Sequence, residues 1–207
     1  MTYVAQNIFH GYAGEVSQEL KGSAFGAHFL IIYPDLPTLR EMYSYYTKSA
    51  LYDKNEIVII LPYYETVDNV RRILSEDSTN IDVRKYEKEQ SLLIIDSLKG
   101  YFGIQEGLMP FVRRTVEFAK TSGHADGVSA LGDVASFFHL QKKDDLLHYE
   151  MTLPTKFEGI NLKEFCLYHK QDFDKVLSEK ERQMLVKHHG KTLHLLPSQS
   201  SVEHLKS

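Results

Sequence analysis

The sequence predicts an α/β fold whose mainly parallel sheet is covered by helices on both faces. Short apolar runs alternate along the chain with segments whose apolar residues recur at helical spacing. The apolar runs show little polar–apolar alternation, as expected of parallel strands that are buried on both faces. Because most strands are followed by a helix, right-handed crossovers to parallel neighbours are expected.

The clearest unit is a strand, a turn and a helix. The strand is expected over His28–Tyr33, an apolar run rich in aromatic and β-branched residues. Asp35 can cap the following helix, and Pro37 suits its first turn. The helix is predicted by apolar residues at helical spacing, namely Leu36, Leu39, Tyr43, Tyr46 and Ala50.

This turn is also where a nucleotide-binding α/β fold would hold a phosphate group. A phosphate loop needs glycines, whose backbone N–H groups approach the phosphate, and a lysine. Residues 33–37 contain no glycine and no lysine, but two prolines, which lack an N–H group, and the acid Asp35. The sequence therefore predicts a nucleotide-type fold whose phosphate loop is degenerate.

The remaining elements follow in order along the chain. Further strands are expected over Glu56–Leu61, 81–85, 91–96, 127–131, 164–168 and 192–196. Helices are expected over 67–74 and 105–121, from Asp133 to Phe138, from Asp144 or Asp145 to Leu153, and over 173–189 in two pieces. Residues 97–103 are expected to form a loop, and a capping box at Ser178 divides the last helical segment.

The domain organisation is expected to be simple. Residues 1–25 have weak periodicity but many aromatic side chains, which predicts an arm that packs on the domain or on a second copy. Residues 26–196 form the α/β domain, and residues 197–207 form a polar tail.

Composition and charge exclude several classes of partner. The 207-residue chain has a net charge of −4, which gives no overall basic field for nucleic acid. No apolar run approaches the roughly 20 residues of a membrane span, and no signal peptide is evident. The single cysteine, Cys166, cannot form an internal disulfide, so a cytoplasmic protein is expected.

Several short patterns occur in a set order along the chain. They are His28 and Tyr33 in HFLIIY, Gly132-Asp133-Val134-Ala135-Ser136, Tyr149-Glu150, Cys166-Leu167-Tyr168 and Asp172-Phe173-Asp174. In this order the chain resembles the MEDS family, a sensory domain of methanogens and methylotrophs within the wider RecA/KaiC-like group. The resemblance covers roughly residues 26–195.

The resemblance implies a RecA/KaiC-like domain without a working ATPase site that acts as a non-catalytic sensory or signalling domain. Its partner would be a small-molecule ligand or a signalling protein, and no cofactor is expected. Two alternatives stay open. One is a degenerate nucleotide-binding protein or metal-dependent enzyme that uses Asp96 and Asp133. The other is a homo-oligomeric interaction protein that associates through its N-terminal arm.

The candidate ligand-binding residues lie mostly where strands end, because open α/β sheets bind ligands beyond the carboxyl ends of their strands. Aromatic and carboxylate groups there suit a small polar or cationic ligand better than a phosphate. The candidates at these ends are Tyr33, Asp35, Tyr63, Tyr64, Asp96, Ser97, Asp133, Tyr168 and His169. The alternative is that the aspartates cap helices and the tyrosines pack at the rim.

His28 and Glu150 complete the candidate set. His28 frames the first strand with Tyr33, although a core histidine held by hydrogen bonds is the simpler interpretation. Glu150 could face Asp133 for acid–base or metal chemistry, or both could pair with Arg113 or Arg114. No HExxH motif and no Cys/His cluster occurs in the sequence, so no metal site is expected.

Overall fold

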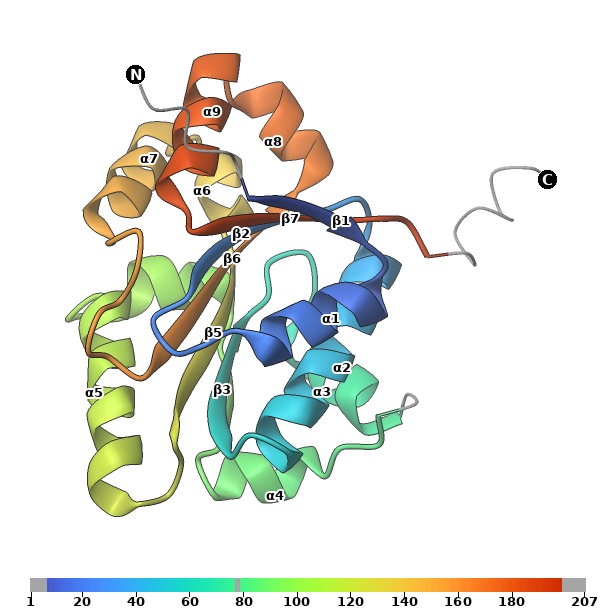
Figure 1. Cartoon of the computed structure of the whole chain (residues 1–207), viewed down its shortest axis with the longest axis vertical. Helices are drawn as coiled ribbons and strands as arrows, with labels where there is room; N and C mark the ends of the chain where they lie inside the picture. Colours follow the sequence, from blue (N-terminus) through green and yellow to red (C-terminus); the bar gives the residue numbers. More distant parts are fainter. Residues whose placement is uncertain (1–6, 77–78, 199–207) are drawn as a thin grey trace.

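The structure is a computed structural model that describes residues 7–76 and 79–198. Within these ranges the chain forms an α/β fold with one seven-stranded, all-parallel sheet (Figure 1). The strands are β1 (Ile8–Gly11), β2 (His28–Tyr33), β3 (Glu56–Leu61), β4 (Leu92–Ile94), β5 (Gly127–Asp133), β6 (Leu162–His169) and β7 (Lys191–Leu195). Their order across the sheet is β1-β7-β2-β6-β5-β3-β4, and this confirms the predicted α/β class.

Helices connect the strands and cover both faces. They are α1 (Ala13–Gly22), α2 (Leu36–Tyr52), α3 (Val67–Glu76), α4 (Val83–Lys88), α5 (Leu108–Ser122), α6 (Ala135–His139), α7 (Lys143–Thr152), α8 (Lys170–Val176) and α9 (Glu179–His188), with a short π-helical turn, η1 (Lys99–Gly103). Figure 1 shows α1 to α4 on one side of the sheet and α5 to α9 on the other.

The central strand β2 shows why both faces must be covered. Ile31 and Tyr33 pack into the core beneath α1 and α2, whereas Leu30 and Ile32 pack into the core that faces α6 to α9. Successive side chains of a strand point to opposite faces, so an apolar run of this kind is stable only between two helical layers.

Local signals begin and end the helices as the sequence predicts. The Asp35 carboxylate accepts a hydrogen bond from the Thr38 N–H at 2.8 Å and so caps α2. Ser178 and Glu181 form a capping box at the start of α9. Gly123 ends α5 with φ of 63°, a left-handed conformation that glycine adopts without strain.

One predicted strand is wrong. Residues 81–85 alternate apolar and polar side chains, but the chain forms α4 there. The Asp82 side chain accepts a hydrogen bond from the Lys85 N–H and so caps a helix that starts at Val83. Only Ile81 of the predicted strand precedes this cap. The predicted loop 97–103 contains η1, and the predicted strand 91–96 is shortened to β4.

The N-terminal segment belongs to the domain core. Within the described part of the expected arm, β1 pairs with β7 in the sheet, and α1 packs against α2 with Val16 and Leu20 fully buried. Its periodicity is weak because β1 has four residues at a sheet edge and is largely exposed. Residues 1–6 of this arm and 199–207 of the expected tail lie outside the described residues.

The connections place a switch point beside β2. The chain leaves β2 for α2 on one face, whereas it leaves the neighbouring β6 for α8 on the opposite face. Loops that diverge in this way open a crevice at the carboxyl ends of the two strands. No helix within residues 7–76 and 79–198 has the length and hydropathy needed to cross a membrane.

Candidate functional site

The crevice at the switch point is built around a buried tyrosine–aspartate pair. The Tyr33 hydroxyl, at the end of β2, donates to Oδ2 of Asp133, at the end of β5, over 2.7 Å. The Ala135 N–H donates to the other carboxylate oxygen at 2.9 Å. Both carboxylate oxygens are therefore engaged by the protein itself.

Burial controls the protonation of this pair. Removal from water raises the pKa of Asp133 to about 7, although the hydrogen bonds from Ala135 and Tyr33 oppose the shift. Burial, and then the charge of Asp133, also raise the pKa of Tyr33 far above its usual value. Near neutral pH the pair therefore holds one carboxyl group close to its titration point.

Aromatic rings close the crevice. The Tyr64 ring lies 5.1 Å from that of Tyr63 and 5.3 Å from that of His169, and the His169 ring lies 5.3 Å from that of Tyr33. The Tyr64 hydroxyl also bonds to the Asp172 carboxylate. The space left between Tyr63, Glu65 and Asp133 is only about 10 Å³, enough for about one water molecule.

Three further candidates do not line this crevice as free groups. Asp35 caps α2, as the simpler interpretation of the sequence has it. Asp96 is exposed and accepts from the Lys99 N–H at 3.1 Å. Ser97 is buried and donates to the backbone oxygen of Asp133, 2.9 Å away.

The other candidates meet on the sheet face covered by α7 and α9. His28 from β2, Glu150 from α7, Cys166 from β6 and His189 after α9 form a group that we term the buried His–Cys–Glu cluster. One nitrogen, oxygen or sulfur atom of each lies within 4.8 Å of those of the others, and all four residues are buried. Tyr168 also faces this cluster, because its hydroxyl donates to Oε1 of Glu150 at 2.7 Å.

Backbone groups orient both imidazoles of the cluster. Nδ1 of His28 lies 2.9 Å from the Pro154 carbonyl oxygen, and Nδ1 of His189 lies 2.8 Å from that of Leu185. A carbonyl oxygen only accepts, so each Nδ1 carries the proton, and each Nε2 points into the cluster.

The cluster favours neutral His28 and ionised Glu150. Burial, reinforced by the charge of His189, lowers the pKa of His28 to about 3. Burial alone would raise the pKa of Glu150, but its contacts with His189 and His28 outweigh burial and lower it. Burial raises the pKa of the Cys166 thiol well above its usual value.

The contacts of Asp133 and Glu150 differ from those expected from the sequence. Asp133 and Glu150 do not pair with Arg113 or Arg114 among the described contacts; each carboxylate bonds to a buried tyrosine, and Arg114 pairs with Glu106. They also lie in separate groups, one at the crevice and one in the cluster. The sequence missed the cluster, because its members come from four elements and Cys166 and His28 are 138 positions apart.

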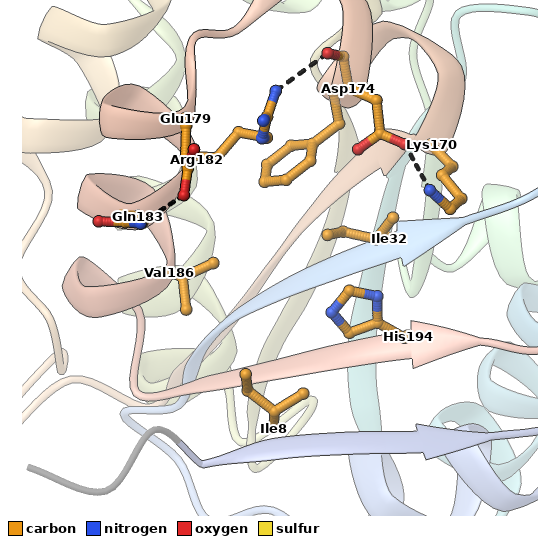
Figure 2. Close-up of a pocket in the computed structure, with 10 residues that line it drawn as sticks. Ile8, Ile32, Lys170, Asp174, Glu179, Arg182, Gln183, Val186 and His194 are labelled. Carbon is orange, nitrogen blue, oxygen red and sulfur yellow. Dashed lines mark hydrogen bonds and ion pairs between the residues drawn. The ribbon is translucent and has the colours of Figure 1, made fainter.

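A groove lies over the edge of the sheet where β1 and β7 pair. Its volume is about 290 Å³, and its floor is formed by Ile8 of β1, His194 of β7 and Ile32 of β2. Figure 2 shows these three side chains below the polar side chains of α8 and α9, with Val186 at the side of the groove that α9 forms. The sequence does not predict this groove, because the groove depends on β1 as the edge strand.

The rim of the groove has balanced charge. Lys170 pairs with the Asp174 carboxylate, and the Arg182 guanidinium donates to the Asp174 backbone oxygen at 2.9 Å (Figure 2). Glu179 accepts from Gln183 at 3.1 Å. Burial, and then the stacked His10 ring 4.6 Å away, lower the pKa of His194, which favours the neutral form of this ring.

Comparisons of this chain with protein-family models, with curated proteins and with solved structures give no match.

Proposed function

We propose that this chain is a non-catalytic sensory or signalling domain of RecA/KaiC-like type that binds a small zwitterionic or neutral polar ligand in the groove between α8, α9 and the sheet edge. The observation that carries this proposal is the groove itself. Its volume of about 290 Å³ is near the lower end of the range for small-molecule sites.

The chemistry of the groove selects the ligand class. Lys170 and Arg182 balance Asp174 and Glu179, so the rim has no net charge. Ile8, Ile32 and Val186 supply an apolar floor and wall. A compact zwitterion with an apolar body, such as an amino acid or a methylated amino acid, matches both features.

The turn after β2 argues against nucleotide binding. In a phosphate-binding fold the N-terminus of this helix would face the phosphate, but here the Asp35 carboxylate occupies it. Pro34 and Pro37 offer no N–H group. A sensory role without ATP hydrolysis is consistent with this arrangement, and the output would pass through a partner protein.

A thermal-shift screen tests this function. The probes are amino acids, glycine betaine and other methylated amines, and ATP with magnesium. A ligand present at 100 times its dissociation constant adds about 2.7 kcal/mol to the free energy of unfolding. Stabilisation by a zwitterion would support the proposal, whereas stabilisation by ATP with magnesium that Asp133→Asn abolishes would favour the alternative of a degenerate nucleotide-binding protein.

A matched pair of variants locates the site. Val186→Trp fills the groove, whereas Val176→Trp places the same ring on an exposed position of α8 outside it. The ligand-induced shift should disappear in the first variant and persist in the second. An equal shift in both variants would place the ligand elsewhere. No shift with any probe, together with a dimeric or larger solution mass, would favour the homo-oligomer alternative.

A further inference from the structure

We propose that the buried His–Cys–Glu cluster is a structural zinc site in which Nε2 of His28, Nε2 of His189, Oε2 of Glu150 and Sγ of Cys166 are the four ligands. This site is separate from the groove and does not depend on the proposed ligand.

Four of the six ligand-to-ligand distances in the cluster are close to the edges of a zinc tetrahedron. Cys166 Sγ lies 3.5 Å from His28 Nε2 and 3.7 Å from Glu150 Oε2. Glu150 Oε2 lies 3.8 Å from His28 Nε2 and 3.4 Å from His189 Nε2. Zinc bonds of 2.0–2.3 Å in tetrahedral geometry require ligand-to-ligand distances of roughly 3.3–3.6 Å. These four distances are within a few tenths of an ångström of the required values, and the two remaining distances, from His189 to His28 and to Cys166, are at most 4.8 Å.

Hydrogen bonding to the backbone turns both Nε2 atoms toward the centre of the cluster. Both Nδ1 atoms donate to backbone carbonyls, so a neutral imidazole presents its Nε2 lone pair toward the Glu150 carboxylate. Within the described chain, His189 Nε2 has no hydrogen-bond partner, although its side chain is fully buried. The Cys166 thiol is 3.7 Å from Glu150 Oε2 and can donate one proton to it, and a cation that replaces this proton would satisfy the facing nitrogen, oxygen and sulfur atoms together.

The surroundings orient the ligands as in known metal sites. Metal-binding histidines usually donate their other N–H group to a carbonyl or carboxylate, and both imidazoles here do so. The Tyr168 hydroxyl engages Oε1 of Glu150 and leaves Oε2 for the centre. The ligand set is also neutral overall, because a Cys166 thiolate and a Glu150 carboxylate balance Zn²⁺.

The coordination implies a structural and not a catalytic metal. Four protein ligands saturate a tetrahedral zinc ion and leave no position for water or substrate. The ligands come from β2, α7, β6 and the junction between α9 and β7, so one ion would hold the helical layer of α7 and α9 to the sheet (Figure 1). On binding, the thiol proton of Cys166 is released to solvent, and a zinc–sulfur bond forms without any redox change.

Metal analysis of the full-length protein is the first test. The protein is purified under reducing conditions without chelators, and its zinc content is measured by inductively coupled plasma mass spectrometry. We expect about one zinc ion per chain. Replacement by Co²⁺ should give the visible bands of tetrahedral cobalt and a thiolate-to-cobalt charge-transfer band. Folded protein that has no stoichiometric metal and takes up neither ion after incubation with it would overturn the proposal.

Two adjacent histidines provide a matched pair of variants. His189→Gln removes a proposed ligand. His188→Gln alters the next residue, whose Nε2 lies 2.8 Å from the Leu153 carbonyl oxygen and outside the ligand set. We expect zinc content to fall at least tenfold in the first variant and to stay unchanged in the second. Equal zinc in both would overturn the assignment.

A third measurement remains informative if His189→Gln does not fold. The wild-type protein is dialysed against a chelator, and its thermal unfolding is measured before and after zinc is restored. We expect the midpoint to fall on chelation and to recover with zinc, because a metal that binds only the folded state stabilises it. An unchanged midpoint with zinc removed would contradict a structural role.

Discussion

At the scale of single residues, burial sets the state of the ionisable groups. Asp133 and His28 are both buried, and their pKa values move in opposite directions, to about 7 and about 3, because burial disfavours the charged form of each. Burial therefore favours the uncharged form of both side chains, which is the protonated form of Asp133 and the deprotonated form of His28. Changes in pH should act on stability through such groups.

Asp133 should make stability depend on pH between about 4 and 7. Its folded pKa is raised from 3.8 to about 7, so the stabilisation from the protonated carboxyl is complete below about pH 4 and is lost as pH rises through about 7. Wild-type protein should lose roughly 3–4 kcal/mol relative to Asp133→Asn over this interval. Urea unfolding at several pH values measures this; parallel curves for the two proteins would contradict it.

Lys163 and Glu56 form a buried ion pair at the amino-terminal end of the sheet. Lys163 Nζ lies 2.7 Å from Glu56 Oε1, and both side chains are almost fully buried. Ser129 and Tyr46 also donate hydrogen bonds to the Glu56 carboxylate. Replacing both partners of a buried ion pair by apolar residues changes the stability of a protein little, whereas removing one partner destabilises it strongly. Variants in which only one partner is replaced are therefore informative.

Replacement of Lys163 by methionine should destabilise the protein by about 3–5 kcal/mol, since Glu56 is left as an unpaired buried charge. The control is Lys21→Met, which breaks an ion pair with Asp53 at the surface. Exposed pairs contribute at most about 1 kcal/mol, so this variant should unfold at nearly the wild-type urea concentration. A similar small loss in both variants would show that Glu56 is not isolated by burial.

At the scale of elements, capping side chains determine where helices begin. Asp82 begins α4 within a segment whose alternation predicts a strand, and Asp35 begins α2 directly after β2. The Asp35 cap on α2 also disfavours phosphate binding at this turn, because its carboxylate occupies the helix N-terminus where a phosphate would bind.

Asp35→Ala should reduce the free energy of unfolding by about 1 kcal/mol through loss of the Thr38 N–H partner. Asp35→Asn retains an oxygen acceptor and should lose only a few tenths of this. Denaturant titration of the two variants separates capping from charge. Equal losses would mean that the carboxylate acts through its charge on the helix terminus and not through the cap.

At the scale of the whole molecule, the sheet is completed by the segment that sequence analysis expects to be an arm. β1 covers the outer edge of β7 and contributes Ile8 to the floor of the groove, while α1 buries Val16 and Leu20 against α2. The groove and the stability of the domain therefore depend on the same segment.

A chain that begins at Phe25 should be strongly destabilised or insoluble, whereas a chain that begins at Asn7 should keep β1 and α1. Loss of two fully buried aliphatic side chains alone removes roughly 3–6 kcal/mol. Circular dichroism with thermal unfolding of the two truncated proteins measures this. Cooperative unfolding of the shorter chain at the same temperature would show that residues 7–24 are an independent arm.

The sequence by itself determined the α/β class, most element positions and the degenerate turn after β2. These features depend on local patterns, such as the apolar run His28–Tyr33 and the caps Asp35 and Ser178. Each such pattern involves only a few consecutive residues and can therefore be recognised without the tertiary structure. The closeness of Tyr33 and Asp133 could also be predicted from the sequence, because both residues lie at the carboxyl ends of parallel strands, and these ends are on the same side of the sheet.

Only the tertiary structure decided which buried polar groups meet. The order β1-β7-β2-β6-β5-β3-β4 brings His28 and Cys166 onto neighbouring strands, and the packing of α7 and α9 adds Glu150 and His189. No spacing along the chain encodes this, because the contacts join distant elements; Cys166 and His28, for example, are 138 positions apart. The groove is likewise decided by the placement of β1, whose short exposed pattern does not predict a strand. Long-range pairing and burial, and not local propensity, therefore create both the groove and the buried His–Cys–Glu cluster.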